Sequence, residues 1–265
     1  EFTHSHGVGG DGVFCGSDGL GNFAVMFSFA TQLAVGVASR LFVFIETLAD
    51  ISLRIIFLDP GNDVFGYLTR SEKMVDSVAN LMDSDAPVCH FHSKLMQKEP
   101  KVGGAWEWHQ DYGYWYNNGC LFPLMATVMI ALDKCTKENG CLQVLSGSNN
   151  LGRIDHALLE SGQVGVDLKR VDEAKKHLEL VYCEMDPGDV LFFHCNTLHR
   201  SDKNNSPNRR WTLLCCYNAA RNNPFIDHHQ PKYTPLNKLR NEEIIKAGDK
   251  FLDVNDVDTF LKRPT

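Results

Sequence analysis

The sequence predicts a mainly β fold with flanking helices, a sandwich or jelly roll. Short apolar or alternating segments recur from residue 88 onward, separated by turn signals such as Asn139-Gly140 and Asp186-Pro187-Gly188. Few helical segments lie between them, whereas a parallel βαβ sheet needs a helical crossover after each strand. With 265 residues, of which 43% are hydrophobic and 22% charged, the chain can bury the core of one large domain.

The N-terminal part differs from the rest of the chain. Residues 1–58 are glycine-rich and then largely apolar, and Asp59-Pro60-Gly61 breaks the chain after them. We therefore treat 1–58 as a segment without an assigned fold and 59–265 as the jelly-roll domain with a C-terminal helical tail, expected to form one structural domain overall. The apolar stretch Phe23 to Ile45 contains Arg40 and several polar residues, which favours a buried helix over a membrane span.

Three segments are expected to be helical. Ser71 can cap the first helix, because apolar residues follow it at helical spacing, at Met74, Val78, Leu81 and Met82. Shorter helical patterns cover Val171 to Leu178 and Asn241 to Phe251.

Six segments are expected to be strands. From Val88 to Leu95 the side chains alternate, which places His90, His92 and Lys94 on one face. We interpret His92 as a residue that packs in or lines a cleft. For Lys94 the alternatives are a solvated side chain and contact with an anionic group. The other segments are Leu124–Leu132, Gly140–Leu145, Leu180–Met185, Asp189–His194 and Trp211–Tyr217.

Charge and cysteine usage restrict the partners and the compartment. A formal charge of -7 is unfavourable for binding polyanions, so no nucleic-acid partner is expected, nor a membrane partner. The nine cysteines form no CxxC pair, and several lie in apolar runs, which indicates reduced, buried thiols and an intracellular, cytoplasmic compartment. Because the chain begins with Glu1, a cleaved targeting peptide and a peroxisome or another organelle stay open.

A candidate metal site combines two distant segments. His109 and Asp111 form an HxD pair, which on an extended strand end projects an imidazole and a carboxylate to the same side. Alone, such a pair more often forms a hydrogen bond in a turn. The segment Asp186 to Ser201 favours metal binding, because a turn and an apolar strand lead to His199, a third ligand. Two histidines and one carboxylate leave adjacent positions on Fe(II) open.

A candidate anion-binding residue follows this site. Arg210 opens the run Trp211 to Tyr217, and if that strand lies beside the metal, its planar guanidinium can bind a carboxylate with two hydrogen bonds. Arg209 is the competing candidate, and strand alternation allows only one of the two to point inward.

Together these motifs resemble the phytanoyl-CoA dioxygenase family of Fe(II)/2-oxoglutarate oxygenases. The resemblance rests on the HxD pair, on Gly188 to His194 followed by His199, Ser201 and Arg210, and on Glu138 to Asn149, which is similar to the ENG-x-L-x-x-x-PGSH segment of that family. It extends from about His92 to Phe225 and implies a double-stranded β-helix.

The resemblance also implies roles for individual residues. Iron is expected on His109, Asp111 and His199, with O₂ and 2-oxoglutarate as cosubstrates. The 2-oxoglutarate carboxylate is expected on Arg210, which the family spacing favours over Arg209, with help from Ser201. Thr127 stands where many relatives carry a large aromatic side chain, so we expect it at the cosubstrate pocket.

The function so implied is hydroxylation of a small organic substrate, such as an acyl-CoA, a lipid-like molecule or a secondary metabolite, with decarboxylation of 2-oxoglutarate to succinate and CO₂. Tyr112, Tyr114 and His92 are the candidates for the substrate side. The aromatic residues between Trp106 and Trp115 fit a core and an apolar substrate wall equally well.

Two other hypotheses stay open at this point. One is a catalytically silent jelly roll that binds a metabolite or a partner. The other is a cupin-type metal enzyme without 2-oxoglutarate, in which replacing Arg210 would change little. The sequence indicates neither the substrate nor the oligomeric state.

Overall fold

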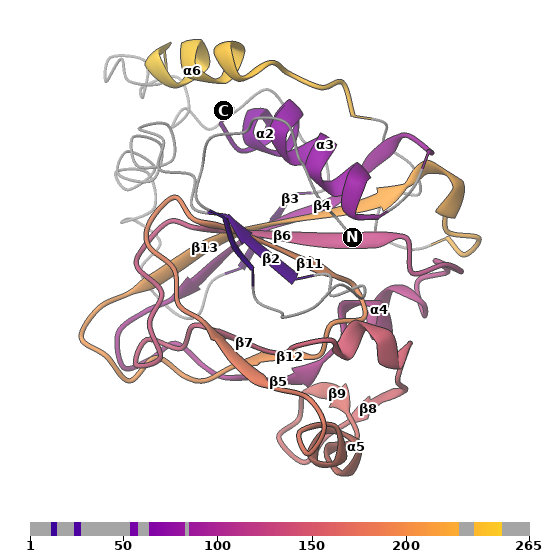
Figure 1. The fold of residues 1–265 in the computed structure, drawn as a ribbon. Helices are drawn as coiled ribbons and strands as arrows, with labels where there is room; N and C mark the ends of the chain where they lie inside the picture. Colours follow the sequence, from indigo (N-terminus) through magenta and orange to yellow (C-terminus); the bar gives the residue numbers. More distant parts are fainter. Residues whose placement is uncertain are drawn as a thin grey trace, which may run out of the picture.

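The described part of the computed structural model consists of residues 12–14, 24–27, 54–57, 64–82, 85–227 and 236–250. Its strands form two antiparallel sheets that face each other (Figure 1). The strands of the large sheet lie in the order β1 (Gly12–Phe14), β2 (Ala24–Phe27), β11 (Val190–His194), β6 (Met125–Ala131), β13 (Arg210–Ala219), β4 (Val88–Lys98) and β3 (Arg54–Phe57). This arrangement confirms the predicted mainly β architecture.

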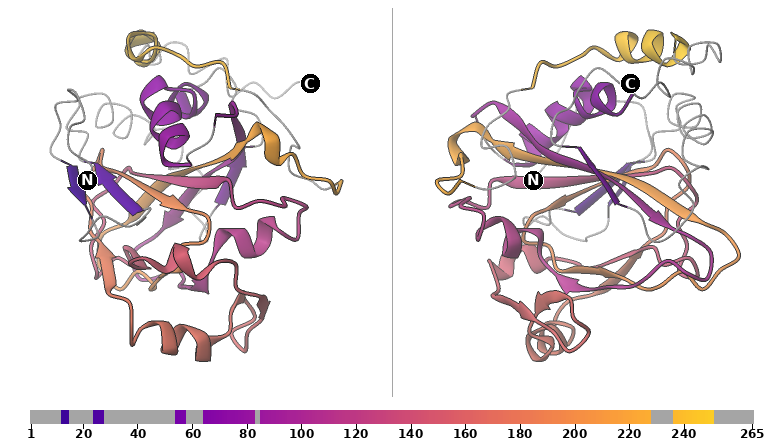
Figure 2. Two further views of the ribbon diagram at one scale, coloured as in Figure 1. Left: turned by 45° about the vertical axis from the view of Figure 1, so that its right-hand side comes forward. Right: turned by 180° about the vertical axis from the view of Figure 1, so that it is seen from behind.

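The small sheet carries fewer and shorter strands. Their order is β10 (Leu180–Cys183), β7 (Leu142–Leu145), β12 (His199–Ser201) and β5 (Trp106–His109). A separate hairpin beside it is formed by β8 (His156–Leu158) and β9 (Val164–Val166). In the two further views of Figure 2 the small sheet again lies on one side of the large sheet, and the helices between residues 64 and 81 and near the C-terminus lie on the other.

The helices follow the same division. The bounds of the longer ones are α2 (Val64–Thr69), α3 (Glu72–Leu81), α4 (Asp111–Trp115), α5 (Leu168–Ala174) and α6 (Asn241–Lys250). Two 3-10 turns are η2 (Ser148–Leu151) and η3 (Ala220–Asn222). The α3 prediction is confirmed, because the Ser71 side chain accepts a hydrogen bond from the Met74 N–H and so caps the helix.

Strand alternation divides the core into two layers. On the outer face of the large sheet, Val128 and Ile130 of β6 pack with Met74 and Val75 of α3. On the inner face, Met129 packs instead toward the small sheet. This second layer also contains Leu191, Phe193, Val144 and Cys183. The inner layer is therefore an apolar core between the two sheets.

All six predicted strand segments form strands, with ends that differ by a few residues. The difference that matters for the site is at β4, which runs three residues beyond Leu95 to Lys98 and pairs there with Arg210. This extension brings a lysine that the sequence pattern did not assign into the interior.

Two helix predictions need correction. The helix expected over Val171 to Leu178 begins earlier, at Leu168, because the Asp167 side chain caps it by accepting a hydrogen bond from the Lys169 N–H at 3.0 Å. It also ends earlier, at Ala174. Within the stretch Phe23 to Ile45, where a buried helix was expected, Ala24–Phe27 form β2, which pairs with β11, and the rest lies outside the described residues.

Two further expectations concern membranes and cysteines. No helix among the described residues is long and apolar enough to cross a membrane. The eight described cysteines are buried thiols, as predicted, and Cys15 lies outside the described residues.

Candidate metal centre

Pairing between β5 and β12 brings the predicted ligands together. His109 ends β5 and lies opposite His199, which begins β12. Gln110 continues the extended backbone with φ -115° and ψ 137°, and Asp111 then begins α4. The ligand atoms of His109, Asp111 and His199 all lie within 4.8 Å of one another, and among the described residues they form the one group that could hold a metal ion.

Both imidazoles present the same nitrogen to this group. The His109 Nδ1 lies 2.6 Å from the Glu107 carbonyl oxygen, and the His199 Nδ1 lies 2.8 Å from the Thr197 carbonyl oxygen. Because a carbonyl can only accept, each Nδ1 carries the proton and each Nε2 keeps a lone pair for a metal. The backbone therefore fixes the tautomer that metal binding requires.

The protonation states agree with this geometry. Burial, and then the neighbouring His199, lower the pKa of His109 to about 3, so its imidazole is neutral at physiological pH. Burial acts to raise the pKa of Asp111, but His199 and Lys94 nearby hold it below its ordinary value. The group thus offers a neutral His109 imidazole and an ionised carboxylate, which are donors that suit Fe(II).

Thr127 contacts the carboxylate of the group directly. Its Oγ1 donates a hydrogen bond of 2.6 Å to the Oδ2 of Asp111, and both side chains are buried. The other oxygen, Oδ1, lies 3.9 Å from the His199 Nε2. Thr127 was expected at the cosubstrate pocket, and the structure adds that it fixes the orientation of Asp111 and leaves one oxygen directed toward the imidazoles.

Gln110 joins three loops around the candidate ligands. Its side chain is fully buried, and its Nε2 donates to the carbonyl oxygens of Gly152 at 2.8 Å and Asn196 at 2.7 Å. Its Oε1 accepts from the Ile154 N–H at 2.7 Å. The residue between the two HxD ligands therefore ties their loop to the segment before His199.

A second polar cluster lies next to His199 on the same strand. Ser201 follows His199 by two residues, so both side chains project from one face of β12, with Cα atoms about 7 Å apart. The Lys98 Nζ donates to the Ser201 Oγ at 2.8 Å and also to the Asp202 carbonyl oxygen. Burial, and then the nearby Arg210, lower the pKa of Lys98 to about 7.

Arg210 completes this cluster. It pairs with Lys98 across β13 and β4, its side chain is buried, and its Nε has no hydrogen-bond partner among the described residues. A buried guanidinium with an unused donor beside a lysine and a serine hydroxyl fits a carboxylate. The Lys98, Ser201 and Arg210 side chains therefore form a cluster that can bind a carboxylate.

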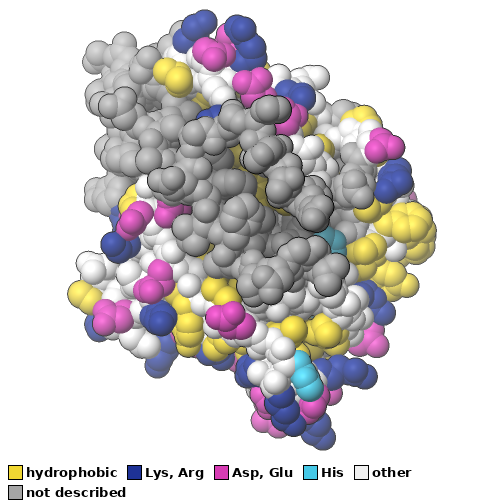
Figure 3. Space-filling view, viewed as in Figure 1, with side chains coloured by type: hydrophobic (Ala, Val, Ile, Leu, Met, Phe, Trp, Pro, Cys, Tyr) yellow, Lys and Arg dark blue, Asp and Glu magenta, His cyan; other side chains and the backbone are white. Residues whose placement is uncertain are grey.

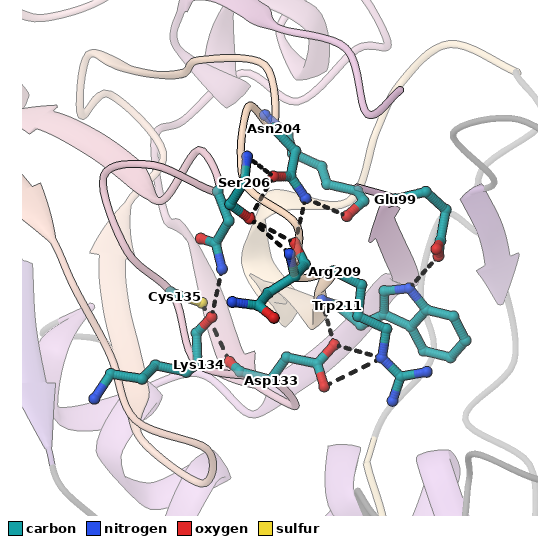
Figure 4. A network of polar contacts seen from close by, with 11 residues as sticks. Glu99, Asp133, Lys134, Cys135, Asn204, Ser206, Arg209 and Trp211 are labelled. Atoms are coloured by element: carbon teal, nitrogen blue, oxygen red, sulfur yellow. Dashed lines mark hydrogen bonds and ion pairs between the residues drawn. The ribbon is translucent and has the colours of Figure 1, made fainter. Parts of the chain in front are cut away.

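Arg209 and Arg210 have different surroundings, and Figure 4 shows those of Arg209. Arg209 points away from the interior, where its Nε lies 3.2 Å from the Asp133 carboxylate and its guanidinium stacks on the Trp211 ring at 4.5 Å. The loop between β12 and β13 is held in the same region, because the Asn204 side chain donates a hydrogen bond to the Lys98 carbonyl oxygen at 2.9 Å. Only Arg210 points inward, as alternation required.

Comparison with known sequences identifies the relatives. A family model described as phytanoyl-CoA dioxygenase (PhyH) matches residues 46–212. The chain belongs to the phytanoyl-CoA dioxygenase family. The resemblance expected from the motifs is thus confirmed, and the match begins well before His92 and ends before Phe225.

Two relatives show how far the likeness extends. L-proline trans-4-hydroxylase from Streptomyces griseoviridis is 29% identical over 180 residues, which cover 62% of this chain and 66% of that protein. A probable alpha-ketoglutarate-dependent hypophosphite dioxygenase from Stutzerimonas stutzeri is 30% identical over 166 residues, 62% of this chain and 56% of that protein. The chain therefore spans less than two thirds of the length of these relatives.

A solved structure supports the fold. EctD from S. alaskensis with 2-oxoglutarate and 5-hydroxyectoine aligns with a TM-score of 0.70 at 20% sequence identity, covering 83% of this chain and 84% of that one. This likeness confirms the jelly-roll fold that was expected for the phytanoyl-CoA dioxygenase family.

The aromatic residues around the HxD pair divide between core and site. Tyr112, expected on the substrate side, instead packs in an apolar cluster, and its hydroxyl donates to the Cys120 carbonyl oxygen at 3.0 Å. Trp108 and Trp115 are likewise buried. Tyr114 is only partly buried, and its ring centroid lies 5.8 Å from that of His109.

His92, the other residue expected on the substrate side, lies at the inner face of β4. It pairs with Cys216, whose Sγ lies 3.7 Å from the Thr127 Oγ1, and its ring centroid lies 6.0 Å from that of Trp115. The structure thus places His92 near the candidate ligands and outside the group that could hold a metal.

Two residues of this family member were not found by sequence reasoning. Lys98 shares the alternation of His92 and Lys94, but the predicted strand ended at Leu95 and so did not include it. Gln110 gave no signal, because the groups that it binds lie more than 40 residues away along the chain.

Proposed function

We propose that this protein is an Fe(II)- and 2-oxoglutarate-dependent oxygenase that hydroxylates a small organic substrate. The observation that carries the proposal is the triad of His109, Asp111 and His199, whose ligand atoms lie within 4.8 Å of one another. Backbone carbonyls fix the tautomer of each imidazole so that its Nε2 can bind a metal. His109, Asp111 and His199 would hold the iron. Membership of the phytanoyl-CoA dioxygenase family supports this assignment.

The polar cluster beside the triad would bind the cosubstrate. Arg210 and Ser201 would hold the distal carboxylate of 2-oxoglutarate, and Lys98 adds a second cation to them. When bound, iron and 2-oxoglutarate supply O₂ activation coupled to decarboxylation, which yields succinate, CO₂ and an oxidised substrate.

The chain itself orients the reactants and excludes water. Thr127 holds one oxygen of Asp111, so the carboxylate is directed before a metal arrives. The ring of Phe193 lies 5.0 Å from that of His199, and it belongs to the apolar inner layer with Met129. Such apolar side chains beside His199 would limit the access of water to the bound reactants.

The substrate side would be formed by Tyr114 and His92, and Tyr112 supports it from the core. The names of the two relatives include L-proline and hypophosphite, which favours a small substrate here as well. On the described part of the face in Figure 3, acidic and basic side chains lie side by side, which supports a small-molecule partner over a nucleic acid.

The location of the protein and its domain organisation belong to the same proposal. The buried thiols support an intracellular location. Pairing of β2 with β11 and of β3 with β4 supports one structural domain that includes residues from the segment 1–58.

The decisive test is anaerobic addition of Fe(II) and then 2-oxoglutarate to the purified protein. We expect a visible metal-to-ligand charge-transfer band in the wild type, no band in His109→Ala and a band that needs more 2-oxoglutarate in Arg210→Ala. If folded wild-type protein gives no band, the oxygenase proposal fails and the silent binding protein takes its place. A band that is unchanged in Arg210→Ala would contradict the cosubstrate assignment alone.

A further inference from the structure

Lys94 lies on the inner face of β4, between the two polar groups of the site. Along this face it follows His92 by two residues and precedes Lys98 by four, so its Cα lies about 13 Å from that of Lys98. In the register with β13 it is opposite Leu214, which packs against the apolar inner layer between the sheets. The Lys94 side chain therefore extends toward the interior, and it is half-buried.

The Lys94 ammonium makes no direct contact with any carboxylate of the described residues. Within the described ranges no hydrogen bond or ion pair involves it, whereas Lys98 donates to Ser201 and Asp202. Its electrostatic neighbours are the carboxylate of Asp111, a candidate metal ligand, and Cys216 on the adjacent strand β13. A half-buried cation in this position can pair with an anionic group of a bound molecule.

Charge balance favours an anion other than the cosubstrate. Fe(II) and the Arg210 guanidinium together balance the Asp111 carboxylate and the two carboxylates of 2-oxoglutarate. The Lys94 ammonium is then one unmatched positive charge, even when Lys98 is neutral. Because Lys94 lies near Asp111 and far from Lys98 along β4, the unmatched charge is at the reacting end of the site.

We propose that Lys94 is a specificity-determining residue that binds an anionic group, a carboxylate or a phosphonate, on the substrate. This inference rests on the proposed oxygenase function and narrows its substrate to small acids. The anion would lie beside the triad, where Tyr114 and His92 would contact the rest of the molecule. Uncharged lipids are then poor substrates, because they leave the ammonium unpaired.

The test compares Lys94→Met, which keeps the length of the side chain and removes the charge, with Lys94→Arg, which keeps the charge. Lys94→Gln serves as a second uncharged variant if Lys94→Met does not fold. In the first arm, 2-oxoglutarate is titrated anaerobically into each Fe(II)-loaded protein, and the charge-transfer band gives its Kd. We expect values within about threefold of the wild type for all variants.

In the second arm, the anaerobic Fe(II) and 2-oxoglutarate complex is titrated with L-proline, hexanoate and 2-aminoethylphosphonate. Each acid is paired with a compound in which an amide or alcohol replaces the acid group. Binding is read by calorimetry and by perturbation of the charge-transfer band. We expect at least one acid to bind wild type and Lys94→Arg, and to bind Lys94→Met about 10- to 100-fold more weakly.

The outcomes separate this inference from the proposed function. A missing band in the wild type refutes the oxygenase itself. A tenfold or larger loss of 2-oxoglutarate affinity in Lys94→Met assigns the ammonium to the cosubstrate and overturns the inference. It is also overturned if no acid of the panel binds the wild type, or if acids and their uncharged counterparts bind equally well to wild type and Lys94→Met.

Discussion

At the scale of single residues, the site depends on backbone and side-chain groups that orient the candidate metal ligands. The two histidines present Nε2 because backbone carbonyls of Glu107 and Thr197 occupy their Nδ1–H groups. Asp111 is held in the same way by Thr127. Because such partners fix ligand orientation before binding, their removal lowers metal affinity while the fold is retained.

Thr127 gives the first prediction. Thr127→Val keeps the shape of the side chain and removes the donor to Asp111, so we expect Fe(II) affinity to fall by about 10- to 100-fold. Thr127→Ser keeps the hydroxyl and should restore most of it. Anaerobic Fe(II) titrations measure both variants, and thermal unfolding of the metal-free proteins serves as the control. Equal Fe(II) affinity in Thr127→Val and wild type would show that the hydrogen bond has no orienting role.

Lys98 gives a prediction about pH. Burial, and then Arg210, lower the pKa of Lys98 to about 7, so the Lys98 amine is protonated below that pH and increasingly neutral above it. An anionic ligand prefers the ammonium form, so 2-oxoglutarate affinity should decrease as pH rises through 7. Between pH 6.5 and 8.5 we expect Kd to increase about tenfold in the wild type.

The control for this prediction is Lys98→Met, which should bind 2-oxoglutarate more weakly at pH 6.5 and show little change up to pH 8.5. Anaerobic charge-transfer titrations give the Kd at each pH. The same pH dependence in both proteins would assign the titration to another group.

At the scale of elements, short strands determine the geometry of the site. β5 and β12 place the two histidines opposite each other, and the segment between β7 and β10 closes over the HxD loop through Gln110 and His156. The His156 ring lies so close to Gly113 that a Cβ there would meet it at 2.1 Å, so Gly113 permits this contact. The inserted segment is thus part of the site.

Gln110 gives the prediction at this scale. Gln110→Leu would leave three backbone groups without their partner, a buried one at Asn196 and partly buried ones at Gly152 and Ile154. We expect the free energy of unfolding to fall by roughly 2–4 kcal/mol, as measured by urea denaturation. Gln163→Leu is the matched control, because Gln163 also bridges loops but is only partly buried, and it should lose about 1 kcal/mol or less. Equal losses in the two variants would contradict the central position of Gln110.

At the scale of the whole molecule, the features that could be predicted are those that a local pattern encodes. Alternation over Val88 to Leu95 and the Ser71 cap are properties of neighbouring residues, and the structure confirms both. The contact of Thr127 with Asp111 and the burial of Tyr112 depend on how two sheets face each other, which no local pattern records. Lys98 shows the intermediate case, since its alternation was visible but its burial arises from pairing with Arg210.

The stability of the folded protein should also depend on bound iron and 2-oxoglutarate. The reason is that the metal site and the polar cluster of Lys98, Ser201 and Arg210 join elements far apart in sequence. Fe(II) binds only the folded protein's assembled ligands, so at about 100 times its Kd it should add about 2.7 kcal/mol and raise Tm by roughly 5–10 °C. Anaerobic 2-oxoglutarate should raise Tm further. His109→Ala should lose both increments, whereas Arg210→Ala should keep the first and lose most of the second. Scanning calorimetry measures these values, and a 2-oxoglutarate increment that survives in His109→Ala would mean that the cluster binds the dicarboxylate without the metal.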